Sequence, residues 1–152
     1  MTQQAMNERV RLKDICNAIK QTLATTAGIN RAGANETIPD GTPDLPLINV
    51  FPSTYEGRSR TDRTTFGGGV RQQDVEIGAR VMLPPKGTFG EAIALQTEIM
   101  DNLIDVFDAQ TEPPFLGHKA IKTFRYKLER VTITEGSREY PGIEITLFIT
   151  LF

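Results

Sequence analysis

The sequence predicts a single α+β domain, spanning residues 1–152, in which two helices pack on one face of a sheet to form a two-layer sandwich. Two segments, 8–23 and 89–107, carry apolar residues at the three-to-four-residue spacing of an amphipathic helix. Other segments alternate apolar and polar residues, as half-buried strands do. Because these elements must bury their apolar faces against each other, we expect a mixed or antiparallel sheet of about four strands.

The first predicted helix runs from Glu8 to Leu23. Its apolar stripe consists of Leu12, Ile15, Cys16, Ile19 and Leu23. Cys16 is the only cysteine, so the chain forms no internal disulfide. Because apolar surroundings raise a thiol pKa, we expect Cys16 to be a small core residue rather than a reactive group. The residues before this helix lack the apolar stretch of a secretory signal, which predicts folding in the cytoplasm.

Residues 25–44 are rich in Gly, Asn, Asp and Pro, and we expect them to form a loop. Leu45–Phe51 then reads as a short strand, with Pro46 near its start, where a missing N–H is tolerated. The next strand is predicted over Val75–Leu83, because apolar residues alternate there with polar ones. Two prolines, at 84 and 85, end it.

The second predicted helix begins at Thr88, which has the spacing of a capping box with Glu91. Its apolar stripe consists of Phe89, Ala92, Ile93, Ile99, Met100, Leu103, Ile104 and Phe107. Asp101 and Asp105 lie on the outer side of the helix and are typical of a solvated face.

The final third of the chain predicts two strands joined by a polar turn. Phe124, Tyr126 and Leu128 alternate with polar residues, but the apolar phase then moves by one residue to Val131, which predicts a β-bulge. The last strand covers 143–152. The apolar burial of this strand nearly offsets its ordering entropy, so we expect it to be paired on both edges, within its own sheet or against a neighbouring subunit.

The second face of the predicted sheet is polar, but it also carries large aromatic rings. Its residues are Glu76, Arg80, Met82, Arg125, Lys127, Glu129, Thr146, Phe148, Thr150 and Phe152. Charged residues alone would fit a solvated face. Exposed rings beside mixed charges are typical of a partner-binding surface.

Residues 53–73 form a long polar connection between two predicted strands. Only Tyr55, Phe66 and Val70 offer apolar surface there, which is too little to offset the entropy of ordering the segment. The segment is therefore either a loop without a specific role or an extended arm that becomes ordered on a partner. Arginines suit the second interpretation, because they form forked bonds with carboxylates and DNA phosphates.

The sequence offers no group of residues suited to catalysis, and we expect no enzyme activity, catalytic residue, metal or cofactor. The only histidine, His118, lies in a predicted turn, where an exposed or locally bonded role is expected. The glycines at 67–69 lack the Lys-Ser/Thr pair of a phosphate-binding loop. The net charge of -2 does not indicate general affinity for nucleic acid.

The order and length of these elements resemble those of the tail terminator, or tail completion, proteins of long-tailed bacteriophages. The resemblance spans nearly the whole chain, from the first helix and the Leu45-Pro-Leu-Ile-Asn-Val strand to the closing hairpin that ends in Ile-Glu-Ile-Thr-Leu-Phe-Ile-Thr-Leu. It implies a structural virion protein at the head–tail junction, assembled in the host cytoplasm. Such proteins form a ring, commonly of six subunits, that ends polymerisation of the tail tube.

The resemblance also implies the partners and the interface. The partners are other copies of the chain, the tail tube protein and the head-side connector protein, while DNA passes through the channel without specific binding and no membrane takes part. The implied subunit and tube interface consists of Arg58, Arg60, Arg63, Phe66, Arg71, Arg80, Arg125, Lys127, Phe148 and Phe152. Two alternatives remain: another head–tail connector or baseplate protein, and a small nucleic-acid-binding module that uses the arginine-rich arm.

Overall fold

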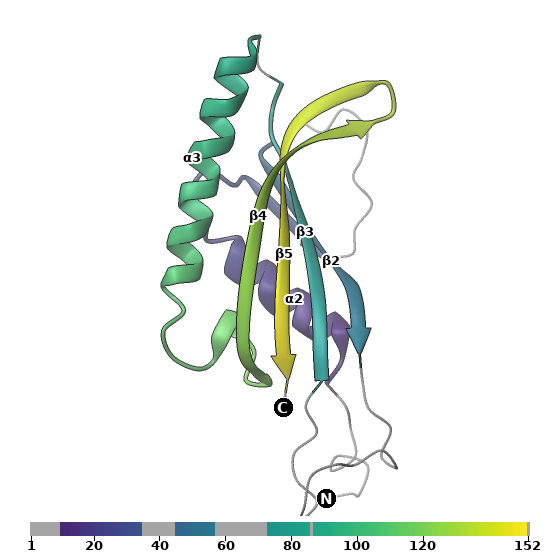
Figure 1. Cartoon of the computed structure of the whole chain (residues 1–152), viewed down its shortest axis with the longest axis vertical. Coiled ribbons are helices and arrows are strands. Elements are labelled where there is room, and N and C mark those ends of the chain that lie inside the picture. Colours follow the sequence, from purple (N-terminus) through teal and green to yellow (C-terminus); the bar gives the residue numbers. More distant parts are fainter. Residues whose placement is uncertain (1–9, 35–44, 57–72, 86, 152) are drawn as a thin grey trace, which may run out of the picture.

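The computed structural model describes residues 10–34, 45–56, 73–85 and 87–151 (Figure 1). The elements in chain order are helix α2 (Leu12–Leu23), strands β1 (Arg31–Ala34), β2 (Leu47–Glu56) and β3 (Gln73–Met82), helix α3 (Phe89–Asp108), the short 3₁₀ helix η2 (Phe115–Gly117), and strands β4 (Ile121–Glu135) and β5 (Arg138–Leu151). The predicted α+β class is confirmed, since both α-helices pack against one open, mixed sheet.

The sheet has five strands in the order β1-β2-β3-β5-β4. All neighbouring strands are antiparallel except β1 and β2, which are parallel and pair Arg31 with Leu47. The prediction of a loop over 25–44 is wrong at β1. Its four residues, RAGA, are too few to show an alternation, and three of them are small; the strand is instead held by its parallel partner and by contacts with α2.

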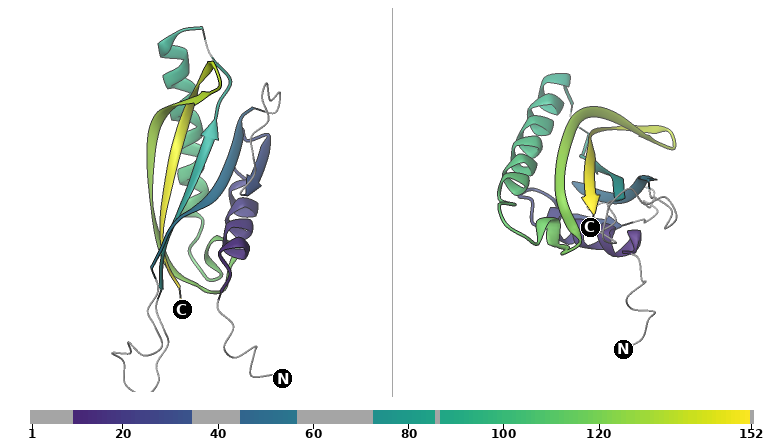
Figure 2. Two further views of the ribbon diagram at one scale, coloured as in Figure 1. Left: turned by 90° about the vertical axis from the view of Figure 1, so that its right-hand side faces the viewer. Right: turned by 60° about the horizontal axis from the view of Figure 1, so that its bottom comes forward.

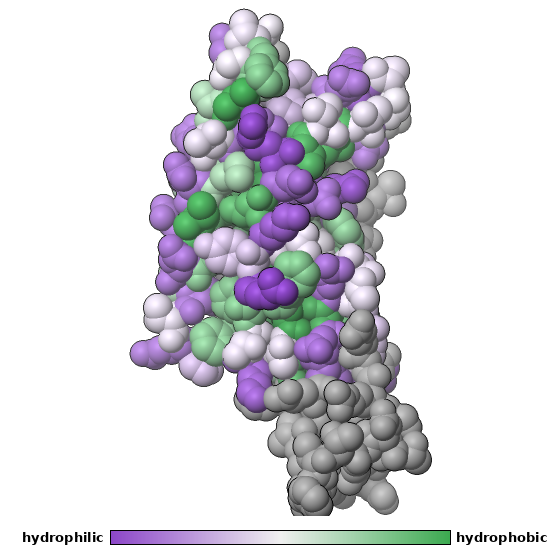
Figure 3. All heavy atoms as spheres, in the orientation of Figure 1, coloured by the Kyte–Doolittle hydropathy of each residue, from purple (hydrophilic) through white to green (hydrophobic). Residues whose placement is uncertain are grey.

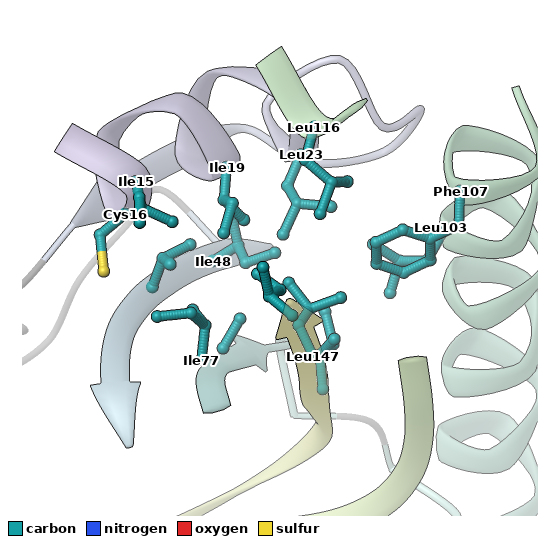
Figure 4. Packing of buried hydrophobic residues seen from close by; sticks show 14 of the residues in the cluster. Ile15, Cys16, Ile19, Leu23, Ile48, Ile77, Leu103, Phe107, Leu116 and Leu147 are labelled. Carbon is teal, nitrogen blue, oxygen red and sulfur yellow. The ribbon is translucent and has the colours of Figure 1, made fainter. Parts of the chain in front are cut away.

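The main core lies between the sheet and the two helices, which cover the same face of the sheet (Figure 2). Ile15, Ile19 and Leu23 of α2 and Leu103 and Phe107 of α3 point toward aliphatic side chains of the central strands (Figure 4). β5 lies between β3 and β4, so the prediction that this strand is paired on both edges is confirmed within its own sheet. Cys16 is buried in this core, as predicted.

The predicted bulge between Leu128 and Val131 is wrong. β4 pairs with β5 without interruption from Thr123 to Glu135, and the register shift lies earlier, between Ile121 and Thr123. The apolar residues change face because the end of the β4–β5 hairpin bends away from α3 (Figure 1). There a second small core forms on the opposite sheet face, consisting of Met82, Ile133 and Tyr140 with Leu45 and Val131 packed against it.

The buried side of helix α3 differs from the predicted apolar stripe at two positions, one apolar and one polar. Thr88 caps the helix as predicted, since its hydroxyl accepts a hydrogen bond from the Glu91 N–H at 3.2 Å. Phe89, however, is 80% exposed. Gln96 is buried instead, and its side-chain amide donates to the carbonyls of Val131 at 3.2 Å and Gly142 at 2.9 Å. This amide ties the helix to the start of the bent hairpin.

Tyr126 of β4 joins α3 through a ring and a hydroxyl contact. Its ring stacks on Phe107 with 4.3 Å between centroids, and its hydroxyl donates to the Asp108 carboxylate at 3.4 Å. Burial, and then the nearby charge of Asp108, raise the pKa of Tyr126 above 10.0.

The raised pKa of Tyr126 predicts a loss of stability at high pH. The folded protein holds this proton more tightly than the unfolded chain, so the contribution is complete below pH ~10 and is lost as pH rises through the folded-state pKa. Tyr126→Phe should remove that step from the pH dependence of the unfolding free energy, measured with urea between about pH 8 and 11. Tyr55→Phe, at an exposed ring, is the control. An unchanged pH profile in Tyr126→Phe would contradict the assignment.

Candidate functional site

The sheet face opposite α2 and α3 carries no helix in the described part of the chain, and we call it the open face (Figures 1 and 2). Its side chains alternate with the buried ones, because successive strand residues point to opposite faces. The strand pairing aligns them in rows that run across β2, β3, β5 and β4; one such row joins Thr54, Glu76, Phe148 and Arg125. Figure 3 shows this face as a mixture of hydrophilic and hydrophobic groups.

The structure places only some of the predicted interface residues. Arg80, Arg125, Lys127 and Phe148 lie together on the open face, as the alternation predicts. Five of the predicted arm residues, and the last residue of the chain, lie outside the described residues: Arg58, Arg60, Arg63, Phe66, Arg71 and Phe152. The arm predicted over 53–73 is shorter than expected, because its first four residues belong to β2 and Gln73 belongs to β3.

One part of the open face is organised around Arg80. Its guanidinium lies 3.9 Å from the Glu144 carboxylate on the paired strand and 6.0 Å from the centre of the Phe51 ring. The Phe51 ring lies across Gly78, where an added Cβ would be 2.6 Å from a ring carbon. Both members of the ion pair are solvent-exposed, so the pair orders the surface more than it stabilises the fold.

Phe148 and Arg125 form a second cation–aromatic pair. They are cross-strand neighbours, and the guanidinium carbon lies 4.2 Å from the centre of the ring. A pair of this kind contributes about 0.5–1 kcal/mol at an exposed site. The pair places an aromatic ring and a charge side by side on the open face, and both residue types are enriched in protein interfaces.

Next to this pair the open face is hollowed into a pocket of about 500 Å³, which we call the Asp74 hollow. Its lining consists of Thr54, Asp74, Val75, Glu76, Thr123, Phe124, Arg125, Phe148, Ile149 and Thr150. Among the residues that the structure describes, hydroxyl groups are the donors to the two carboxylates of this lining. Glu76 accepts from Thr54 at 3.1 Å and Ser53 at 3.4 Å, and Asp74 accepts from Thr150 at 3.3 Å. Within the described ranges neither carboxylate has a cation at salt-bridge distance.

Asp74, Thr54 and Phe51 are members of this face that the sequence pattern did not predict. Asp74 could have been predicted, because the alternation of apolar and polar residues that begins at Val75 extends back to Gln73, and β3 begins there. Thr54 could not have been predicted from alternation, because a register shift between Pro52 and Thr54 changes which residues of β2 point to the open face. That shift lets the hydroxyls of both Ser53 and Thr54 reach Glu76.

The described residues bring together no further candidate for chemistry. No group of three or more His, Cys, Asp or Glu in that part of the chain could hold a metal ion. His118 is bonded locally, as predicted, because its Nδ1 accepts from the Ala120 N–H at 3.0 Å. Asp101 and Asp105 are exposed on α3. None of the described helices is long and apolar enough to cross a membrane.

No protein-family model and no curated protein matches this sequence. Function is therefore inferred from the open face itself. Its rings, guanidinium groups and carboxylates suit the recognition of another macromolecule, and the Asp74 hollow gives that surface a recess lined by two carboxylates.

Proposed function

We propose that this chain is a structural virion protein that forms a ring at the head–tail junction of a long-tailed bacteriophage. The ring ends polymerisation of the tail tube and joins the tail to the head-side connector protein. The observation that carries the proposal is the open face, where paired rings and charges extend over four strands while both helices cover the other side. Aromatic residues and arginine are enriched in protein interfaces, which supports a partner on this face.

A ring is consistent with the way β5 is paired within one chain. β5, the most apolar strand, has both edges paired, so the subunit does not need a neighbour to complete its core. The surface left for assembly is polar and mixed in charge. Such surfaces suit subunits that fold first and then assemble, whereas subunits that fold only together share apolar interfaces.

Two measurements on the purified full chain test this function. Negative-stain images and native mass spectra should show a ring with a central hole. Adding the protein to the polymerising tail tube protein of the same particle should shorten the tubes, because each capped end stops growing. A protein that remains monomeric at all concentrations and leaves the tube length unchanged would overturn the proposal.

The same material separates the two alternatives. A ring that binds portal-side rings but leaves tube length unchanged indicates another connector or baseplate protein. Binding of DNA that weakens steeply with salt indicates a nucleic-acid-binding module, because phosphate contacts release counterions. The tail terminator role predicts neither result, since DNA slides through its channel without specific contacts.

Phe148→Ala should weaken ring assembly by about tenfold or more, because aromatic rings held at an interface carry much of its energy. The melting temperature of the monomer should change little, since Phe148 is only half-buried and loses mainly its contact with Arg125. Sedimentation over a range of concentrations measures assembly, and circular dichroism measures melting. Phe89→Ala removes an 80% exposed ring from the start of α3 and is the matched control. Unchanged assembly of Phe148→Ala would remove this residue from the interface.

A further inference from the structure

The Asp74 hollow has the features of a receptor for a basic chain segment. Asp74 and Glu76 lie two residues apart on β3 and point to the same face, so their backbone positions are separated by about 7 Å. Among the described residues their carboxylates accept hydrogen bonds from hydroxyl groups, and a carboxylate has more acceptor sites than these bonds fill. The side chain of Phe148 forms an apolar wall beside them.

The sequence contains one segment with matching charge outside the described residues. Residues 57–72 carry four arginines, at positions 58, 60, 63 and 71, against a single acidic residue, Asp62. The other internal segment outside the description, 35–44, carries three acidic residues and no basic one. In residues 1–9 the one glutamate is balanced by the one arginine. Charge complementarity therefore selects residues 57–72.

The spacing of the charges matches as well. Arg58 and Arg60 are separated by one residue, so an extended chain would present both guanidinium groups on one side, about 7 Å apart. This is the separation of the Asp74 and Glu76 positions on β3. Guanidinium groups form forked, charge-assisted hydrogen bonds with carboxylates. Arg125 adds one positive charge to the hollow, which nevertheless retains a negative excess from its two carboxylates.

We infer that the Asp74 hollow of one subunit binds the segment 57–72 of a second copy of the chain, with Arg58 and Arg60 paired to Asp74 and Glu76. The inference rests on the proposed ring and identifies its subunit contact. A ring requires two different, complementary surfaces on each subunit. The hollow is one surface, and the arginine-rich segment is the other.

A second copy fits better than the segment of the same chain. Glu56 pairs with Asp74, and Thr54 pairs with Glu76, so a continuation of β2 along the same line leads away from Glu76 by about 3.3 Å for each residue. Arg58 of the same chain could approach Asp74 diagonally, but Arg60 would then lie farther from Glu76. A segment from another subunit crosses the open face without this constraint.

A charge exchange in the full chain tests the contact. Asp74→Lys with Glu76→Lys reverses the hollow, and Arg58→Glu with Arg60→Glu reverses the segment. Each double variant alone should assemble about 100-fold more weakly than the natural chain in sedimentation and native mass spectrometry. An equal mixture of the two should restore the ring, because every subunit contact then joins opposite charges. Asp101→Lys with Asp105→Lys, on the exposed side of α3, should assemble normally.

The outcomes separate the contact from the proposed function. If the mixture fails to assemble while a single chain with all four exchanges forms the ring, the pairing lies within one chain and the inference is wrong. If the natural chain forms a ring and both double variants do so at equal concentration, the ring stands and this contact is wrong. If the natural chain forms no ring, the proposed function fails together with the contact.

A milder pair of variants guards against loss of folding. Asp74→Asn with Glu76→Gln keeps the size of both side chains, and circular dichroism reports whether the fold is retained. The natural ring should weaken as salt rises from about 0.05 to 0.5 M, because its pairs are screened. The neutral variant should weaken less steeply with salt. Equal salt dependence of the two proteins would also overturn the inference.

Discussion

Leu147→Ala should lower the free energy of unfolding by about 2–5 kcal/mol. Leu147 is 0% exposed and lies at the centre of β5, paired with Ile77 on one side and Tyr126 on the other. Its side chain points into the core between the two helices, so its removal leaves a cavity that several elements would have to fill (Figure 4). The loss combines the lost burial of the side chain with the cost of that cavity.

Urea unfolding measures this effect, and the next residue provides its control. Thr146 points to the open face and is half-exposed, so Thr146→Ala should change stability by no more than about 0.5 kcal/mol. The slope of unfolding free energy against urea should stay the same in both variants if the native and unfolded ensembles keep their compactness. A loss below about 1 kcal/mol in Leu147→Ala would show that the helices close the cavity by moving inward.

The sequence predicts the helices and most strands of this fold, because their buried residues recur at the regular spacing of a helix or a strand. The stripe of α2, the cap at Thr88 and the alternation of β5 depend on neighbours within a few residues, and all three are observed. β1 could not be predicted in the same way. Its four residues gain their structure from pairing with β2, which is a contact between segments about 16 residues apart.

The errors at the hairpin and in α3 share one physical cause. The apolar residues after Leu128 change face because the hairpin bends and builds a second core, and no local pattern distinguishes this from a bulge. Gln96 was left out of the predicted stripe because it is polar, yet it is buried where two backbone carbonyls of the hairpin need a donor. Both features are decided by tertiary contacts.

The sequence predicts which residues lie on the open face, but it does not predict the Asp74 hollow. Arg80, Arg125, Lys127 and Phe148 follow from alternation alone, because their neighbours in sequence are buried in β3 and β5 and partly buried in β4. The Asp74 hollow depends on the register that aligns β2, β3, β5 and β4, and on a shift within β2. Register is a long-range property, so the partnership of Asp74, Glu76 and Phe148 appears only in three dimensions.

Gly142→Ala should destabilise the protein by about 1–3 kcal/mol, because the position has no space for a methyl group. An added Cβ would lie 2.5 Å from Cδ1 of Ile133 and 2.9 Å from the carbonyl oxygen of Val81. The end of the Ile133 side chain can rotate away. The Val81 carbonyl belongs to the backbone of β3, which pairs directly with Ile143 and cannot move without disturbing that pairing. The Gln96 amide also holds the carbonyl of Gly142 in place.

A second variant identifies which of the two obstacles dominates at Gly142. Adding Ile133→Ala removes the side-chain obstacle, so any stability recovered relative to the sum of the single changes measures that contact. We expect only partial recovery, because the Val81 carbonyl remains. Gly90→Ala, on α3 where the added Cβ would meet no other element within 4 Å, should be neutral or stabilising by up to about 1 kcal/mol. If Gly142→Ala is as stable as the natural chain in urea, β5 does not hold Gly142 tightly against β3.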